Sequence, residues 1–226
     1  MIMARDFNAA SERLEVAAAV PVRDAGAVRT SFRVQRWDED ATAWVERALR
    51  AGQGPFRPGC ELTPRVFSHY RVRPYSVTVD EDCNMVLQAG WVALLGGIAG
   101  TSITTKWGAT VGRIGVGDSS TASTYTMTDL QAATNKYYQL VSGAPTIATG
   151  SAPATLTFSA VFGTGNANFA WQEFVSDEGT ASNTGPVVAT CLNRGVSAQG
   201  TKASGQTWTA TETISFGYPS GAGTVS

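Results

Sequence analysis

Charged side chains are scarce in this sequence. Lys, Arg, Asp and Glu make up 15% of its 226 residues, against roughly 25% in ordinary globular proteins. The formal net charge is −1, so no long-range field favours nucleic acid or an anionic membrane as a partner. Glycine and hydroxylated residues take the place of the missing charges, which favours an all-β surface that neighbouring copies cover.

Histidine is almost absent. The one histidine, His69, lies between Ser68 and Tyr70, and neither a Gly-x-Ser-x-Gly nor a His-Glu-x-x-His motif occurs. A Ser-His-Asp or Cys-His arrangement would depend on His69 alone. A lone histidine beside aromatic rings is usually a packed or surface residue, so we predict no nucleophilic catalysis of this kind.

Cysteine is rare and odd in number. Cys60, Cys83 and Cys191 lie far apart, without a Cys-x-x-Cys or Cys/His cluster, and this spacing argues against a structural zinc site. The spacing leaves one disulfide between two of the three cysteines as an alternative. Three reduced thiols agree better with folding in a reducing cytoplasm.

No hydrophobic run is long enough to cross a membrane. The most apolar segment, residues 85–100, has 16 residues and four glycines, whereas a membrane span needs roughly 20. We predict a buried helix over residues 84–95 instead. Arg5 and Asp6 stand where a secretory signal would need apolar residues. The apolar face of the predicted helix consists of Val86, Leu87, Gly90, Trp91, Leu94 and Leu95.

The charges that do occur are concentrated in one part of the chain. Of the 35 charged residues, 24 precede Asn84, and 12 of these are basic and 12 acidic. A balanced mixture favours ion pairs between subunits over a track for phosphates. We expect a charged N-terminal arm or small subdomain (1–82, with short strands and a helix near 40–51), the apolar helix (83–100), a β-sandwich (101–218) and a flexible tail (219–226).

Alternating side chains predict several antiparallel strands. In residues 28–35, 155–161 and 207–216 an apolar series alternates with Thr, Ser or Arg, the pattern of a sheet with one buried side. Short strands separated by Gly/Ser/Thr turns are typical of a β-sandwich, so the predicted fold class is mainly β, an antiparallel β-sandwich with one or two short packed helices and an extended or helical arm before it. Strands are also expected at 13–22, 113–116, 169–174 and within 186–196. Residues 65–79 should form an extended segment that Pro74 interrupts. A helix is expected within 126–141, with Thr128 as N-cap and an inner face made of Leu130, Ala133, Tyr137 and Leu140 or Val141.

Carboxylates are the only residues that could carry catalysis. Glu173 with Asp177 or Glu178, or Asp118 with Asp129, could form the pair of a glycoside hydrolase. Glu173 stands in the aromatic strand "FAWQEF" and should be buried. We interpret it as a structural carboxylate that pairs with Arg194, Arg113 or backbone amides.

The stretch "RIGVGDSSTA" (residues 113–122) resembles a phosphate-binding loop only superficially. It lacks the Gly-Lys-Ser/Thr ending of a Walker A motif and the third glycine of a dinucleotide fingerprint. We expect a strand that ends in a turn, with Gly115 and Gly117 for close packing and Asp118 bonded to the local backbone. No cofactor is predicted, and the acids of "DED" (residues 80–82) are interpreted as capping or solvated charge, with structural calcium left open.

Several quoted segments taken together resemble a family of tailed-bacteriophage structural proteins. The segments are "GWVALLGGIAG", "RIGVGDSSTA", "TDLQAATNK", "VFGTGNANFAWQEF", "CLNRGV" and "GTKASGQTWTATETISF", in this order over roughly residues 83–217. Trp171, Glu173, Asn193 and Arg194 occupy the family's aromatic-plus-Glu strand and Asn-Arg strand end. The opening "MARDFNAASERLEV" resembles the first strand of a laminin-G-like jelly roll in phage proteins, which could serve as an arm that joins a neighbour's sheet.

The resemblance implies a virion component without catalytic residues. It implies a place in the tail, collar or fibre, with a capsid decoration protein as the alternative, and assembly with other copies and with tail, portal or major capsid proteins in the bacterial host cytoplasm. A glycan- or receptor-binding module that uses Trp107, Tyr125, Tyr137 or Tyr138 and a host-surface glycan is a second alternative, and a hydrolase a third. The structural or assembly candidates are Trp171, Glu173, Arg194, Arg113, Asp118, Trp91 and Trp208.

Overall fold

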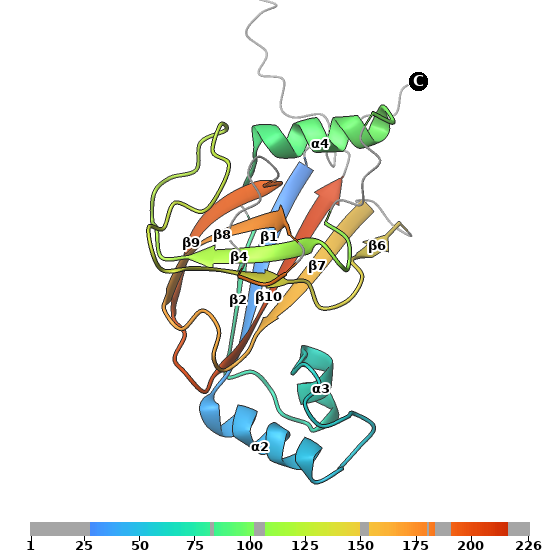
Figure 1. Ribbon diagram of the computed structural model, residues 1–226, viewed down its shortest axis with the longest axis vertical. Helices are drawn as coiled ribbons and strands as arrows, with labels where there is room; N and C mark the ends of the chain where they lie inside the picture. The colour runs from blue at the N-terminus through green and yellow to red at the C-terminus, as the bar shows by residue number, and fades with distance from the viewer. Residues whose placement is uncertain are drawn as a thin grey trace, which may run out of the picture.

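Two antiparallel five-stranded sheets face each other in a β-sandwich (Figure 1). The computed structural model describes residues 28–81, 84–101, 107–149, 154–179, 181–183 and 191–216. Sheet A has the order β2 (Ser76–Asp80), β1 (Val28–Trp37), β10 (Thr207–Phe216), β7 (Ala154–Phe162), β6 (Thr146–Ala148). Sheet B has the order β3 (Asn84–Val86), β9 (Asn193–Thr201), β8 (Ala170–Glu178), β4 (Gly112–Gly117), β5 (Lys136–Leu140). The predicted fold class is confirmed.

The alternation in the sequence places the core between the sheets. Along β10, Trp208, Ala210, Glu212 and Ile214 are buried, and the threonines between them lie on the other face, as the period of two requires. Phe32 of β1 stacks on Phe174 of β8 at 4.9 Å between ring centroids, which joins sheet A to sheet B. The main core comprises Phe32, Val34, Ile114, Val116, Phe158, Phe162, Trp171, Phe174, Trp208 and Ile214, among others.

Strand β1 lies between the edge strand β2 and the central strand β10 of sheet A. It pairs with β10 from Val28↔Phe216 to Trp37↔Thr207, and its other edge pairs with β2. Residues 28–37 and 76–80 therefore belong to the sandwich, although the sequence boundary at 82 assigned them to an arm. The predicted first strand at 13–22 and the tail at 219–226 lie outside the described residues.

Two helices form a small layer at one end of the sandwich (Figure 1). The predicted helix near 40–51 is confirmed as α2 (Glu39–Arg50). Asp38 caps the start of this helix, because its side chain accepts a bond from Ala41 N at 2.8 Å. The prediction of an extended segment over 65–79 is wrong in its first part. Thr63 caps a short helix there, α3 (Pro64–His69), whose Phe67 stacks on Trp37 of β1 at 4.3 Å.

The apolar helix begins later than predicted and is less buried. Residues 84–86 form β3, and the helix is α4 (Gln88–Ile98), which crosses the opposite end of the sandwich from α2 and α3 (Figure 1). Within α4 only Gly90 is buried. A Cβ at Gly90 would lie 2.1 Å from the carbonyl oxygen of Leu192, so the helix meets the sandwich closely at this glycine and leaves other apolar side chains in solvent.

The helix predicted within residues 126–141 is wrong. Residues 118–135 contain no helix or strand, and β5 then pairs with β4. We call residues 118–135 the covering loop. Leu130 of this loop and Tyr138 of β5 pack with Val175 on the outer face of sheet B, and this tertiary contact prevails over the helical spacing of the apolar residues.

Candidate functional site

Two arginine–carboxylate pairs are buried on the outer face of sheet B. Arg194 of β9 binds Glu173 of β8, with Nη2 at 2.6 Å and Nε at 3.0 Å from Oε2. Arg113 of β4 binds Asp177 of β8, with Nη2 at 2.6 Å from Oδ2 and Nε at 3.0 Å from Oδ1. All four side chains are shielded from solvent. The interpretation of Glu173 as a partner of Arg194 is confirmed, whereas the partner of Arg113 is Asp177.

Glu173 also holds the covering loop against the sheet. Its Oε2 accepts a bond from the backbone N–H of Gln131 at 2.8 Å, and its Oε1 accepts one from Ala132 at 2.7 Å. With the two bonds from Arg194, the carboxylate has four donors. The carboxylate is also fully shielded from solvent, so these four bonds are structural and the group does not face a substrate.

Asp177 and Arg113 sit in a second closed arrangement. The guanidinium of Arg113 lies 4.8 Å from the ring centroid of Tyr138, and its Nη1 donates to the carbonyl of Ala181 at 3.0 Å. Burial raises the pKa of Asp177 to about 6, although Arg113 opposes this shift. A Cβ at Gly179 would lie 2.4 Å from Cζ of Arg113, so the glycine makes room for the guanidinium.

The glycines of "RIGVG" are explained by the same outer face. Ile114 and Val116 point into the core, so Gly115 and Gly117 point outward with Arg113. A Cβ at Gly115 would lie 2.7 Å from Cγ2 of Val175, and one at Gly117 would lie 2.4 Å from Oε1 of Glu173. The stretch is a packing site for the covering loop, and the predicted strand is confirmed as part of β4.

Asp118 closes the turn that follows β4. Its carboxylate accepts a bond from Nδ2 of Asn135 at 2.7 Å, and its N–H donates to the carbonyl of Asn135 at 3.2 Å. The two ends of the covering loop are thereby joined. In the middle of the loop, Asp129 accepts a bond from the hydroxyl of Tyr138 and lies 3.6 Å from Nζ of Lys136. Asp118 and Asp129, considered above as an alternative carboxylate pair, are thus engaged in structural bonds.

A third carboxylate, Glu212, lies between the two sheets and was not singled out from the sequence. It accepts bonds from Ser176 of β8 and Asn193 of β9, and Asn84 of β3 donates to it at 3.4 Å. No described lysine or arginine forms an ion pair with Glu212. Burial therefore raises its pKa to about 8. A Glu in the buried series of an alternating strand is the sequence signal for this group.

The predicted aromatic candidates fall in two places. Trp171 and Trp208 are buried in the core, where their rings meet at 69° with centroids 4.9 Å apart. Trp208 also lies under the guanidinium of Arg36 at 4.7 Å. Trp91 is half-buried on α4. The candidates thus comprise core residues, the outer face of sheet B and the helix, and they form no single site.

The predicted sugar-stacking aromatics are mostly covered. Trp107 and Tyr138 are buried, and Tyr137 packs edge-on against Phe162 at 6.3 Å. Tyr125 alone among the four is well exposed.

Helix α4 presents an apolar surface to solvent. Val92, Leu95 and Ile98 are 66%, 59% and 85% exposed, and they recur every three residues, so they lie along one side of the helix. The helix contains no Asp, Glu, Lys or Arg. We call these three residues the α4 surface.

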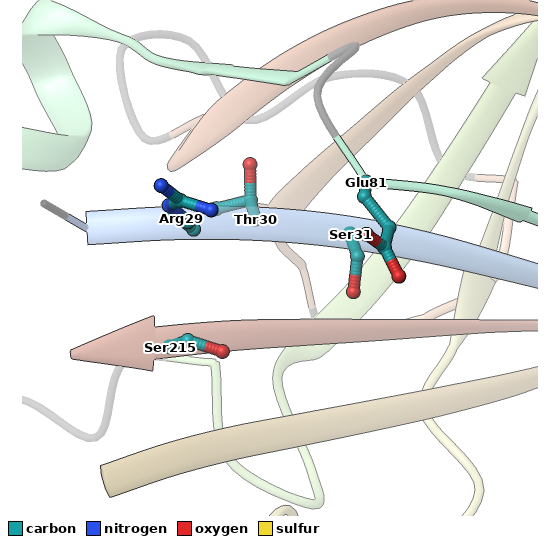
Figure 2. Close-up of a pocket in the computed structure, with 5 residues that line it drawn as sticks. All are labelled: Arg29, Thr30, Ser31, Glu81 and Ser215. Atoms are coloured by element: carbon teal, nitrogen blue, oxygen red, sulfur yellow. The ribbon is translucent and has the colours of Figure 1, made fainter. Parts of the chain in front are cut away.

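A shallow groove at one end of β1 and β10 is polar (Figure 2). It has a volume of about 180 Å³ and is lined by Arg29, Thr30, Ser31, Glu81 and Ser215. The side chain of Glu81 reaches toward Ser31, whereas Arg29 lies farther along the strand (Figure 2). The lining carries charges of both signs and hydroxyl groups, and none of the described lining residues is a histidine or a cysteine.

The remaining candidate chemistry is not assembled within the described residues. His69 packs edge-on against Phe56 and Tyr70, with centroids 5.4 and 5.0 Å away. Cys60 and Cys191 are free thiols. Across the described ranges, no group of three or more His, Cys, Asp or Glu side chains is arranged to hold a metal ion, and no helix there is long and apolar enough to span a membrane.

Comparisons with known proteins found no matching family model, no matching curated protein and no matching solved structure.

Proposed function

We propose that this protein is a non-enzymatic structural component of a bacteriophage virion. It assembles by packing against other copies and other virion proteins, in the tail, collar or fibre region. The sequence resemblance over residues 83–217 supports the virion assignment, and the α4 surface supports assembly as the activity.

The α4 surface is the observation that carries the proposal. Val92, Leu95 and Ile98 stand in water on a helix without a charged residue. Full burial of one aliphatic side chain of this kind stabilises a complex by roughly 1.5–3 kcal/mol. Contiguous exposed apolar residues commonly mark protein–protein contacts. A neighbouring subunit that covers α4 would remove these three side chains from water.

The buried ion pairs support a structural role over hydrolysis. A hydrolase needs two carboxylates that reach the substrate, whereas Glu173 and Asp177 are fully buried and each is bound to an arginine. Such pairs define which elements meet, and here they join β8 to β4, to β9 and to the covering loop.

A pair of matched variants tests the α4 surface. Val92→Asp places a charge on α4, and Val79→Asp makes the same change on β2, where Val79 is 53% exposed. We expect both variants to fold, because neither side chain is in the core. Val92→Asp should lower incorporation into particles about tenfold or more, since a buried unpaired charge costs several kcal/mol, while Val79→Asp should incorporate normally.

Incorporation is measured by supplying each variant to particles that lack the native protein and quantifying the chain in purified particles. Normal incorporation of folded Val92→Asp would refute α4 as the assembly surface. Equal loss in both variants would show that the effect is a general consequence of added charge.

A further inference from the structure

A second pocket lies where the α2–α3 layer meets the sandwich. It has a volume of about 250 Å³ and is lined by α2, by the segment between α2 and α3, by β5 and β7, by the β7–β8 loop and by the start of β10. We call it the junction pocket. Both sheets and the helical layer contribute to it, so its walls are held by the fold and do not depend on one loop.

One hydroxyl at the junction pocket has no partner. Thr207, at the start of β10, is fully buried, and its Oγ1 makes no hydrogen bond. Thr207 also lines the pocket, so its hydroxyl is a candidate partner for a ligand bound there. Leaving such a buried hydroxyl without a partner costs roughly 1–3 kcal/mol. Nearby, Nδ2 of Asn166 donates to Oε1 of Gln139 at 3.4 Å, so the pocket also contains amide groups.

The charge of the junction pocket is negative. Glu46 and Glu61 line it, and none of its described lining residues is a Lys, Arg or His. Glu46 is bound to Arg50 at 2.9 Å, whereas Glu61 has no ion-pair partner among the described residues. Although Glu61 as a residue is exposed, the protein surrounds its carboxyl group enough for desolvation to raise its pKa. A cation beside Glu61 would offset this cost.

The apolar part of the lining fits a short hydrocarbon chain. Leu62 and Val161 are buried and contribute the apolar wall. A primary ammonium has three donors, and a guanidinium has five. The oxygens of Glu61, Thr207 and Gln139 are the acceptors that such a group requires.

We propose that the junction pocket binds an organic cation, an ammonium or guanidinium group on a short aliphatic chain, with Glu61 and Thr207 as its principal acceptors. The group can belong to a small free amine or to a Lys or Arg side chain of a partner, since the recognised chemistry is the same. This inference is independent of the α4 surface, which lies at the other end of the sandwich (Figure 1).

Titration of the full chain with 1,4-diaminobutane at physiological salt tests the proposal, with chemical shifts of the backbone amides as the readout. We expect saturable shifts at Gly163, Thr164 and Thr207, and none with the uncharged isostere 1,4-butanediol. The peptides acetyl-Gly-Lys-Gly-amide and acetyl-Gly-Arg-Gly-amide identify the source: tighter binding of a peptide supports a partner's side chain, and tighter binding of the diamine supports a free amine.

Three variants determine whether the named acceptors are responsible. Glu61→Gln should raise the Kd about tenfold or more, because it removes a charge-assisted bond. Thr207→Val should raise the Kd by about two- to tenfold without lowering Tm, since no bond within the protein is lost. Glu81→Gln removes the same charge at a distant groove and should leave the Kd unchanged.

Two results would overturn the proposal. One is the absence of saturable binding by the diamine and by both peptides. The other is an equal rise in Kd for Glu61→Gln and Glu81→Gln, which would mean that the cation responds only to net charge. A loss of stability in Thr207→Val with unchanged binding would likewise assign Thr207 a purely structural role.

Discussion

Replacement of Glu173 by glutamine tests the interior of the fold most sharply. The amide keeps one acceptor oxygen but places an NH₂ group among the donors of Arg194, Gln131 and Ala132. Arg194 is then buried without a counter-charge, and breaking a buried pair in this way costs roughly 3–5 kcal/mol. At about 2–4 °C per kcal/mol for a domain of this size, Tm should fall by roughly 6–20 °C.

Two assays check this prediction. Urea or thermal unfolding gives the free energy of unfolding, and hydrogen exchange reports whether the amides of Gln131 and Ala132 lose protection as the covering loop is released. Glu81→Gln, an exposed carboxylate, is the control and should change the free energy by less than about 0.5 kcal/mol. A Glu173→Gln protein with native stability and native protection of the loop would refute the structural role.

Two further variants probe the packing of sheet B and the interior carboxyl. Gly115→Ala should lower the free energy of unfolding by about 1–3 kcal/mol, because the added methyl group would crowd Val175 and Tyr138. Gly163→Ala is the control, since its Cβ would meet nothing within 4 Å, and it should be near neutral. Equal costs for the two variants in urea unfolding would contradict the close-packing argument. Glu212 has a pKa of about 8 in the folded protein, against the ordinary value of 4.5, so between these two pH values the folded state keeps a proton that the unfolded state releases. The contribution of Glu212 to the free energy of unfolding is therefore fully present below pH 4.5 and is lost as pH rises through 8. The total loss is on the order of 5 kcal/mol. Glu212→Gln should remove this loss, and parallel stability–pH curves for the two proteins would show that Glu212 does not titrate in this range.

The alternation of side chains predicted much of the sandwich. In β7 every second residue from Phe158 to Phe162 is apolar and buried, and in β10 the alternate positions from Trp208 to Ile214 are buried and, apart from Glu212, apolar. The burial of Glu173 was also predictable, because a carboxylate among aromatic residues requires a cation or amide donors. The sequence left Arg194, Arg113 and backbone amides open as its partners, and the structure has Arg194 and two amides there.

Other features depend on contacts between distant residues. Leu130, Ala133 and Tyr137 have helical spacing within their segment, yet Leu130 packs with Tyr138 and with Val175 of β8, whose position no local pattern encodes. The exposure of α4 was also unpredictable, since a helix that is apolar on all sides has no polar face to indicate which side meets solvent. The unpartnered Thr207 depends on where the α2–α3 layer meets the sheets.

A residue-resolution map of the assembled particle tests the central claim most directly. The account predicts that copies of this chain occupy the virion and that Val92, Leu95 and Ile98 of α4 are buried against a neighbouring subunit. A particle that lacks the chain, or one in which α4 faces solvent in every copy, would contradict it.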